Sequence, residues 1–157
     1  MTIYFYKVNE EYGCFSNFSP HAIVMGDKVW PTSEHYYQAQ KFMGTAHDPH
    51  LCEQIRAAHT PEEAAALGRD RTHTIRTDWE QVKRQIMYEA VLQKFSKHLD
   101  IQRILLATED AEIIEDSPRD YYWGCGEDNT GKNYLGKILM QVRAEIRQSQ
   151  VARPKLS

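Results

Sequence analysis

Apolar residues recur at the spacing of one helix face through the middle of the chain, at Trp79, Val82, Ile86, Ala90 and Phe95. Positions three and four apart lie on the same side of a helix, so this pattern predicts an amphipathic helix that runs to about Lys97. The segment Thr77-Asp-Trp-Glu80 is a capping box, which is a sequence signature of a helix start. Trp79 itself is expected to be a core residue or a ring that stacks on a flat ligand.

Several other segments carry the start and stop signals of helices. The predicted helices cover residues 30–42, 47–58, 60–68, 101–107 and 135–148. Their expected start signals are Pro31 followed by Thr32 or Ser33, the capping box Thr60-Pro-Glu-Glu63, and Asp100. Gly44 is expected to separate the first two helices, and Gly68 is expected to end the third. We expect a frayed tail from about residue 149 onward.

Strand signals lie near both ends of the chain. Residues 3–8 and 112–115 are rich in β-branched and aromatic side chains, which predicts two short strands. Residues 22–25 and 28–30 flank Gly26-Asp27, a pair typical of a tight hairpin turn. Helices outnumber strands, so the sequence predicts an α+β class, with one mainly helical domain of 157 residues and a small β-sheet.

The net charge, the cysteines and the lengths of the apolar runs limit which molecules this protein is expected to bind and where it is expected to reside. The net charge of −3 argues against binding nucleic acid through bulk electrostatics, although a local basic pocket is compatible with it. The three cysteines, Cys14, Cys52 and Cys125, are scattered, as reduced thiols of a cytoplasmic protein would be. The sequence has neither an apolar run of membrane-spanning length nor a signal-peptide pattern, so we expect a cytoplasmic protein without a membrane partner.

One face of the predicted helix over residues 30–42 gathers chemically useful side chains. Glu34, Tyr37, Gln38 and Lys41 lie three and four positions apart and therefore share that face. A carboxylate, an amide and an amine beside aromatic rings are typical of a binding or catalytic site. The alternative interpretation is a solvated face in which Glu34 and Lys41 form an ordinary ion pair.

Four segments in this order resemble motifs of the NADAR family, also called the YbiA-like N-glycosidases. They are residues 12–18, 30–42, 68–71, and 120–124 continuing to 131–136. The resemblance implies the NADAR/YbiA-like fold over the whole chain and cleavage of an N-glycosidic bond to ribose. One branch of the family acts on the first riboflavin-pathway intermediates, 5-phosphoribosylamino pyrimidines such as 5-amino-6-(5-phosphoribosylamino)uracil. The other removes ADP-ribose from guanine in nucleic acid.

The resemblance directs three residues toward catalysis. Glu34 would stabilise the positive charge that develops at ribose C1 or orient a water; otherwise it is a first-turn residue that favours the helix dipole. Lys41 would act as a neutral amine that attacks a ring-opened sugar; otherwise it is a surface lysine. Asp120 would bind ribose hydroxyls. Direct attack by water, assisted by Glu34, remains the alternative to the Lys41 route.

A wider set of residues is expected to bind the substrate. Arg69 and Arg71 suit a phosphate or pyrophosphate, although either arginine can instead pair locally with Asp70. The loop 126–133 nearly fits a P-loop but ends in Asn133 rather than Ser or Thr, so it predicts only an anion seat at a helix start. The full substrate-binding set is Asn17, Tyr36, Gln38, Arg69, Arg71, Trp79, Trp123, Gly131, Lys132 and Asn133.

No metal or organic cofactor is expected. His47, His50 and Cys52 form a cluster weaker than a zinc motif. The expected partner is a small-molecule phosphoribosylamino pyrimidine or an ADP-ribosyl substrate, with nucleic acid a partner only for the second activity. A module that binds ADP-ribose or NAD without turnover is the alternative of another class, but it would not need Glu34 and Lys41 together.

Overall fold

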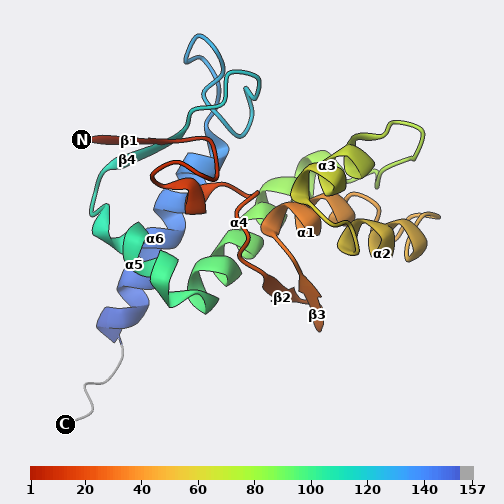
Figure 1. The fold of residues 1–157 in the computed structure, drawn as a ribbon, viewed down its shortest axis with the longest axis horizontal. Coiled ribbons are helices and arrows are strands. Elements are labelled where there is room, and N and C mark those ends of the chain that lie inside the picture. Colours follow the sequence, from red (N-terminus) through yellow and green to blue (C-terminus); the bar gives the residue numbers. More distant parts are fainter. Residues whose placement is uncertain (153–157) are drawn as a thin grey trace. The chain divides into compact units, whose positions relative to one another are not determined.

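The computed structural model describes residues 1–152, so the predicted tail lies outside the described residues from position 153 onward. The chain divides into two compact units. One unit comprises residues 17–94, and the other combines residues 1–16 with the chain from Phe95 onward. Helices outnumber strands among the described residues, which confirms the predicted α+β class (Figure 1).

In the unit of residues 17–94, the predicted hairpin is present. Strand β2 (Ile23–Met25) pairs antiparallel with β3 (Lys28–Trp30), and Val24 lies opposite Val29. Gly26 and Asp27 at the turn have φ angles of 60° and 62°. Positive φ at both central positions defines the type I′ turn, whose twist matches that of the strands.

Three short helices follow the hairpin: α1 (Ser33–Gln40), α2 (His50–Arg56) and α3 (Pro61–Arg69). Thr32 and Thr60 cap α1 and α3, since their hydroxyls accept the amides of His35 and Glu63. Helix α1 packs against α2, α3 and β3. The unit then continues into α4 (Trp79–Lys97), whose predicted apolar residues are buried except for the half-buried Val82.

Several predicted helix ends were wrong. Pro31 precedes the cap of α1 instead of standing in its first turn, and the helix stops at Gln40. Helix α2 begins at His50, later than expected. Gly68 lies inside α3, which ends one residue later at Arg69, and a Cβ atom on Gly68 would overlap the side chain of Gln38 in α1.

The second unit is built around a parallel strand pair. Strand β1 (Thr2–Phe5) pairs with β4 (Glu112–Glu115), with Ile3 opposite Ile113. Helices α5 (Leu99–Ala107) and α6 (Tyr134–Ala152) pack together, and α6 also covers β4. Asp100 lies in the first turn of α5 and is not its cap, and α6 continues past the predicted end at Gln148.

Aromatic rings fill the interior of this unit beside the short 3-10 turn Gly13–Phe15. Phe15 meets Phe5 edge-on at 5.8 Å between ring centroids and meets Phe95 at 5.9 Å. Phe5, Phe15 and Phe95 are at most 1% exposed. Edge-to-face packing of this kind contributes beyond simple burial, so the three rings form the core of the unit.

Asn133 joins β4 to the start of α6. Its Oδ1 accepts the amide of Glu115 at 3.0 Å, and its Nδ2 donates to the carbonyl of Ile113 at 2.9 Å. The residue is buried and has a φ of 53°, in the left-handed region that asparagine tolerates better than most residues. The two side-chain hydrogen bonds of Asn133 therefore tie the start of α6 to strand β4.

We expect Asn133→Ala to lower the free energy of unfolding by about 2 kcal/mol more than Asn129→Ala. Asn129 is exposed in the same loop and has a φ of 63°. Its replacement by alanine therefore imposes a similar backbone strain but leaves the two hydrogen bonds of Asn133 in place. Urea denaturation of both variants measures the difference. Equal losses would show that the two buried hydrogen bonds contribute little.

Candidate active site

Helix α1 is buried along its whole length, from Ser33 to Gln40. Glu34 is 5% exposed and Gln38 is 2% exposed, and the Gln38 amide nitrogen donates to Glu34 Oε1 at 2.7 Å. The shared face predicted from their spacing is therefore present. The alternative of a solvated face is wrong, because these polar side chains lie in the interior.

Asn17 holds the start of this helix. Its backbone carbonyl accepts the amide of Glu34 at 3.2 Å, and its Oδ1 accepts the hydroxyl of Ser33 at 2.9 Å. The Asn17 amide nitrogen donates to the sulfur of Met87. These contacts give Asn17 a structural task, so its predicted role toward a base or sugar remains a prediction.

Lys41 follows α1 directly as its C-terminal cap residue. Its Nζ donates to the carbonyl of Gly68 at 3.3 Å and lies 5.8 Å from the centre of the Tyr37 ring. The Lys41 carbonyl accepts the amide of Arg76 at 2.8 Å. Backbone and side chain are therefore both held, and the amine is directed along α1 toward α3.

The surroundings of Lys41 disfavour its charged form. Burial is the largest influence and lowers the pKa of the amine to about 8, against the carboxylate of Glu34, which raises it. The positive charges of Arg69 and Lys83 act in the same direction as burial. At neutral pH roughly one molecule in ten then carries a neutral, nucleophilic amine.

Lys83 belongs to this cluster although it was not predicted. It lies one turn beyond Trp79 on α4, its side chain is 13% exposed, and its Nζ is 2.7 Å from Glu80 Oε2. The spacing of four residues from Trp79 is the signal that would have placed it on the same helix side.

The aromatic candidates of this unit are mostly interior. Trp79 is 4% exposed and packs against Tyr37 at 5.1 Å between ring centroids. Tyr36 is 8% exposed and meets Trp30 edge-on, and burial raises the pKa of its hydroxyl. Little ring surface of Trp79 or Tyr36 is left to stack on a base, which favours the core interpretation of Trp79.

Arg69 and Arg71 are both exposed at the end of α3. The Asp70 carboxylate between them accepts the amide and hydroxyl of Thr72, at 3.0 and 2.8 Å. The Asp70 carboxylate therefore stabilises a local turn with Thr72 rather than an ion pair with the neighbouring arginines. The positive charge of Arg69 acts on the Lys41 amine and helps to lower its pKa.

The remaining predicted residues lie in the other unit. Asp120 Oδ1 accepts the amides of Tyr122 at 3.0 Å and Trp123 at 2.7 Å, so this carboxylate organises its own turn. Trp123 is half-buried and meets Tyr122 edge-on. Lys132 is exposed, with its Nζ 6.0 Å from the centre of the Tyr134 ring.

The backbone amides at the start of α6 are not free to bind an anion, contrary to the prediction. They donate instead to carbonyls of residues 121–125. The amides are those of Gly131, Lys132, Asn133, Tyr134 and Leu135. Gly131 serves close packing, since a side chain there would meet the backbone of Gly124 and Cys125. A glycine loop alone predicts open amides, but the loop folds back on itself and satisfies them.

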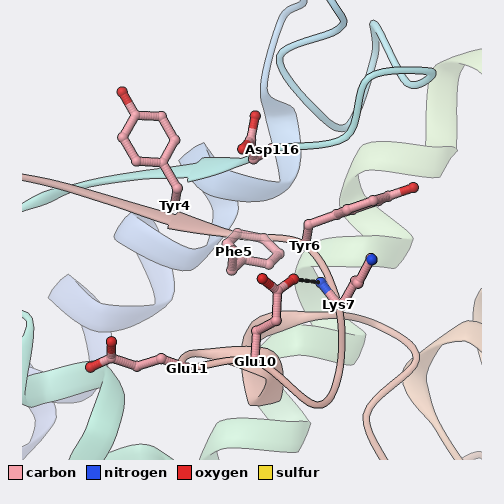
Figure 2. Close-up of a pocket in the computed structure, with 7 residues that line it drawn as sticks. All are labelled: Tyr4, Phe5, Tyr6, Lys7, Glu10, Glu11 and Asp116. Carbon is pink, nitrogen blue, oxygen red and sulfur yellow. Dashed lines mark hydrogen bonds between the residues drawn. The ribbon is translucent and has the colours of Figure 1, made fainter.

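A hollow of about 260 Å³ lies beside β1 and contains none of the predicted site residues. Figure 2 shows Tyr4, Tyr6 and Asp116 around it, with Glu10 accepting the amide of Lys7. Glu34 and Lys41, the first two predicted catalytic residues, lie instead in the unit of residues 17–94.

Within the described range, residues 1–152, no group of three or more His, Cys, Asp or Glu side chains is arranged to hold a metal ion. Cys52 is buried and donates to the carbonyl of Ala39, His47 packs against His73, and His50 is exposed. None of the helices traced over these residues is long and apolar enough to span a membrane.

Three relatives align with nearly all of this chain. An N-glycosidase of Nostoc punctiforme is 60% identical over 94% of this chain and 94% of its own length. A chloroplastic riboflavin biosynthesis protein of Zea mays is 46% identical over 92% of this chain, which corresponds to 25% of the maize protein. N-glycosidase YbiA of Escherichia coli is 44% identical over 92% of this chain and 88% of its own.

The solution structure of Escherichia coli YbiA superposes with a TM-score of 0.89 at 42% identity, covering 98% of this chain and 89% of that chain. This similarity confirms the YbiA-like fold. The sequence model of the NADAR domain matches residues 4–147, which is most of the chain. This protein therefore belongs to the NADAR domain family.

Proposed function

We propose that this protein is an N-glycosidase that hydrolyses the bond between ribose and the exocyclic amine of early riboflavin-pathway intermediates, the 5-phosphoribosylamino pyrimidines. Its task would be the removal of reactive metabolites. The similarity to N-glycosidases and to a riboflavin biosynthesis protein supports the activity and the substrate class. The observation that carries the proposal is the Lys41 amine, with its lowered pKa, in one cluster with the Glu34 carboxylate.

The chemistry of such substrates suits an amine. A sugar joined to an exocyclic nitrogen can open its ring to an imine at C1. The neutral Lys41 nitrogen then adds to C1, the base amine departs with a proton, and a new imine joins Lys41 to the sugar. Water hydrolyses that imine, which frees the sugar phosphate and restores the amine.

Glu34 would act on the charge that this route creates. Its carboxylate is buried, and a buried charge acts more strongly on its neighbours than one in water. It is thus suited to stabilise a cationic imine, or an oxocarbenium-like centre if water attacks directly. The hydrogen bond from Lys41 to Gly68 fixes the amine while leaving its lone pair for attack.

Incubation with each substrate class, followed by mass detection of the free base and sugar, tests the proposal. We expect release of base and ribose phosphate from a phosphoribosylamino pyrimidine, with little activity on ADP-ribosylated guanine in DNA. The opposite preference would identify the ADP-ribosyl hydrolase activity. Binding of ADP-ribose without product in either reaction would identify a binding module.

We expect Glu34→Gln to lower kcat by about a hundredfold, the usual cost of removing one electrostatic stabiliser, while KM changes much less. Steady-state kinetics on the preferred substrate measures both constants. Glu62→Gln is the matched control, because Glu62 also lies in the first turn of a helix but is exposed. If the two variants behave alike, Glu34 serves only the helix dipole.

We expect borohydride added during turnover to leave a reduced sugar adduct on Lys41, detectable by peptide mass analysis. Lys41→Arg keeps the positive charge but cannot form the imine, so it should fold normally and lose activity. Lys137→Arg, at an exposed position of α6, controls for the loss of any amine. Full activity of Lys41→Arg, or turnover without an adduct, would favour direct attack by water assisted by Glu34.

A further inference from the structure

Helices α1 and α3 approach each other closely at Gly68. A Cβ atom built on this glycine would lie 2.7 Å from both Cβ and Cδ of Gln38, and closer still to Oε1. Contacts this short do not occur between real side chains, so an alanine at position 68 would displace Gln38 or the helix. The missing side chain of Gly68 is therefore what makes room for the Gln38 amide.

The Gln38 amide has two different neighbours. Its nitrogen donates to Glu34 Oε1, whereas its own oxygen is buried without a hydrogen-bond partner among the described residues. That oxygen occupies the place where a larger residue at position 68 would carry its Cβ atom. Rotating the amide by half a turn would place its oxygen against the Glu34 carboxylate, which is unfavourable, so the orientation of Gln38 is fixed.

Gly68 also contacts the other half of the cluster. Its carbonyl accepts the Nζ of Lys41 at 3.3 Å. One glycine thus touches both the side chain that holds Glu34 and the amine of Lys41. Gly68 itself is buried, and its hydrogen bond with the half-buried Lys41 is partly buried.

We infer that Gly68 and Gln38 are positioning residues that together set the distance and direction between the Glu34 carboxylate and the Lys41 amine. The Gln38 amide donates a hydrogen bond to the Glu34 carboxylate. Gly68 leaves room for the Gln38 side chain, and its carbonyl accepts a hydrogen bond from the Lys41 amine. This role differs from the substrate contact expected of Gln38. Its importance for catalysis rests on the proposed function, although the arrangement itself can be measured without a substrate.

The titration of the Lys41 amine measures the arrangement directly. Trace acetylation between pH 6 and 11, followed by quantitative peptide mass analysis, gives the midpoint at which Lys41 becomes reactive. The charged groups that act on it come from each element packed around it: Glu34 on α1, Arg69 on α3 and Lys83 on α4. The wild-type midpoint is expected at about 8.

Gln38→Glu should raise this midpoint, because the new carboxyl shares one proton with the buried Glu34 carboxyl and adds negative charge near the amine as that proton leaves. Gln85→Glu is the matched control: Gln85 donates to Glu89 at the same spacing of four residues but on an exposed surface. Gly68→Ala should also raise the midpoint, since the amine loses its anchor and becomes better solvated. With an active enzyme, both variants should lose on the order of tenfold to a hundredfold in kcat, with smaller changes in KM.

A wild-type titration midpoint in folded Gln38→Glu and Gly68→Ala would overturn the inference, whatever the substrate. If Gly68→Ala does not fold, Gln38→Glu decides alone. If wild-type protein cleaves no N-glycoside yet the midpoints shift as expected, the proposed function fails and the positioning stands. Shifted midpoints with unchanged kcat would overturn the catalytic part of the inference.

Discussion

The unit of residues 17–94 depends on a constraint at α1: a short helix that is buried on all sides carries polar side chains on several of them. A buried polar group costs free energy unless it finds a partner, so the neighbouring segments must supply partners at fixed positions. The Oδ1 of Asn17 meets this need for the Ser33 hydroxyl, and the Thr32 hydroxyl and the Ala58 carbonyl meet it for the His35 ring.

His35 shows how specific these partners are. Its Nε2 lies 3.0 Å from the carbonyl of Ala58, which can only accept, so Nε2 carries the proton. Its Nδ1 then accepts the hydroxyl of Thr32 at 2.7 Å, while the same oxygen accepts the His35 amide. Burial lowers the pKa of the ring, in keeping with this neutral form. The cap of α1 is thereby tied to the segment between α2 and α3.

The sequence predicted those features that depend on local spacing and local chemistry. Residues three and four apart share a helix face in any helix, so Glu34 and Gln38 were placed together correctly. The Gly26-Asp27 turn needs positive φ angles that few other pairs supply, so the hairpin was predicted correctly. The Thr60 cap was predicted for the same kind of reason.

Features that depend on neighbours distant in sequence were missed. A glycine at position 68 is typical of a helix end. In the structure, however, Gly68 lies inside the helix, and the side chain of Gln38, thirty residues earlier, occupies the space that a Cβ atom at position 68 would need. The amides of Gly131 and Lys132 have the appearance of an anion seat, but carbonyls of the preceding loop accept them. Burial of α1 on every side could not be read from its polar composition, because composition does not reveal which partners the fold supplies.

The position of Lys41 at the end of α1 combines opposing electrostatic effects. The C-terminal end of a helix favours a cation by about 0.3–1 kcal/mol, which is less than one pKa unit. The Glu34 carboxylate also favours the charged amine. Burial and the charges of Arg69 and Lys83 nevertheless outweigh both, since the pKa lies at about 8, well below the ordinary value of 10.5. The amine can therefore lose its proton near neutral pH while the helix end and Gly68 still hold it in place, a combination that an exposed lysine does not have.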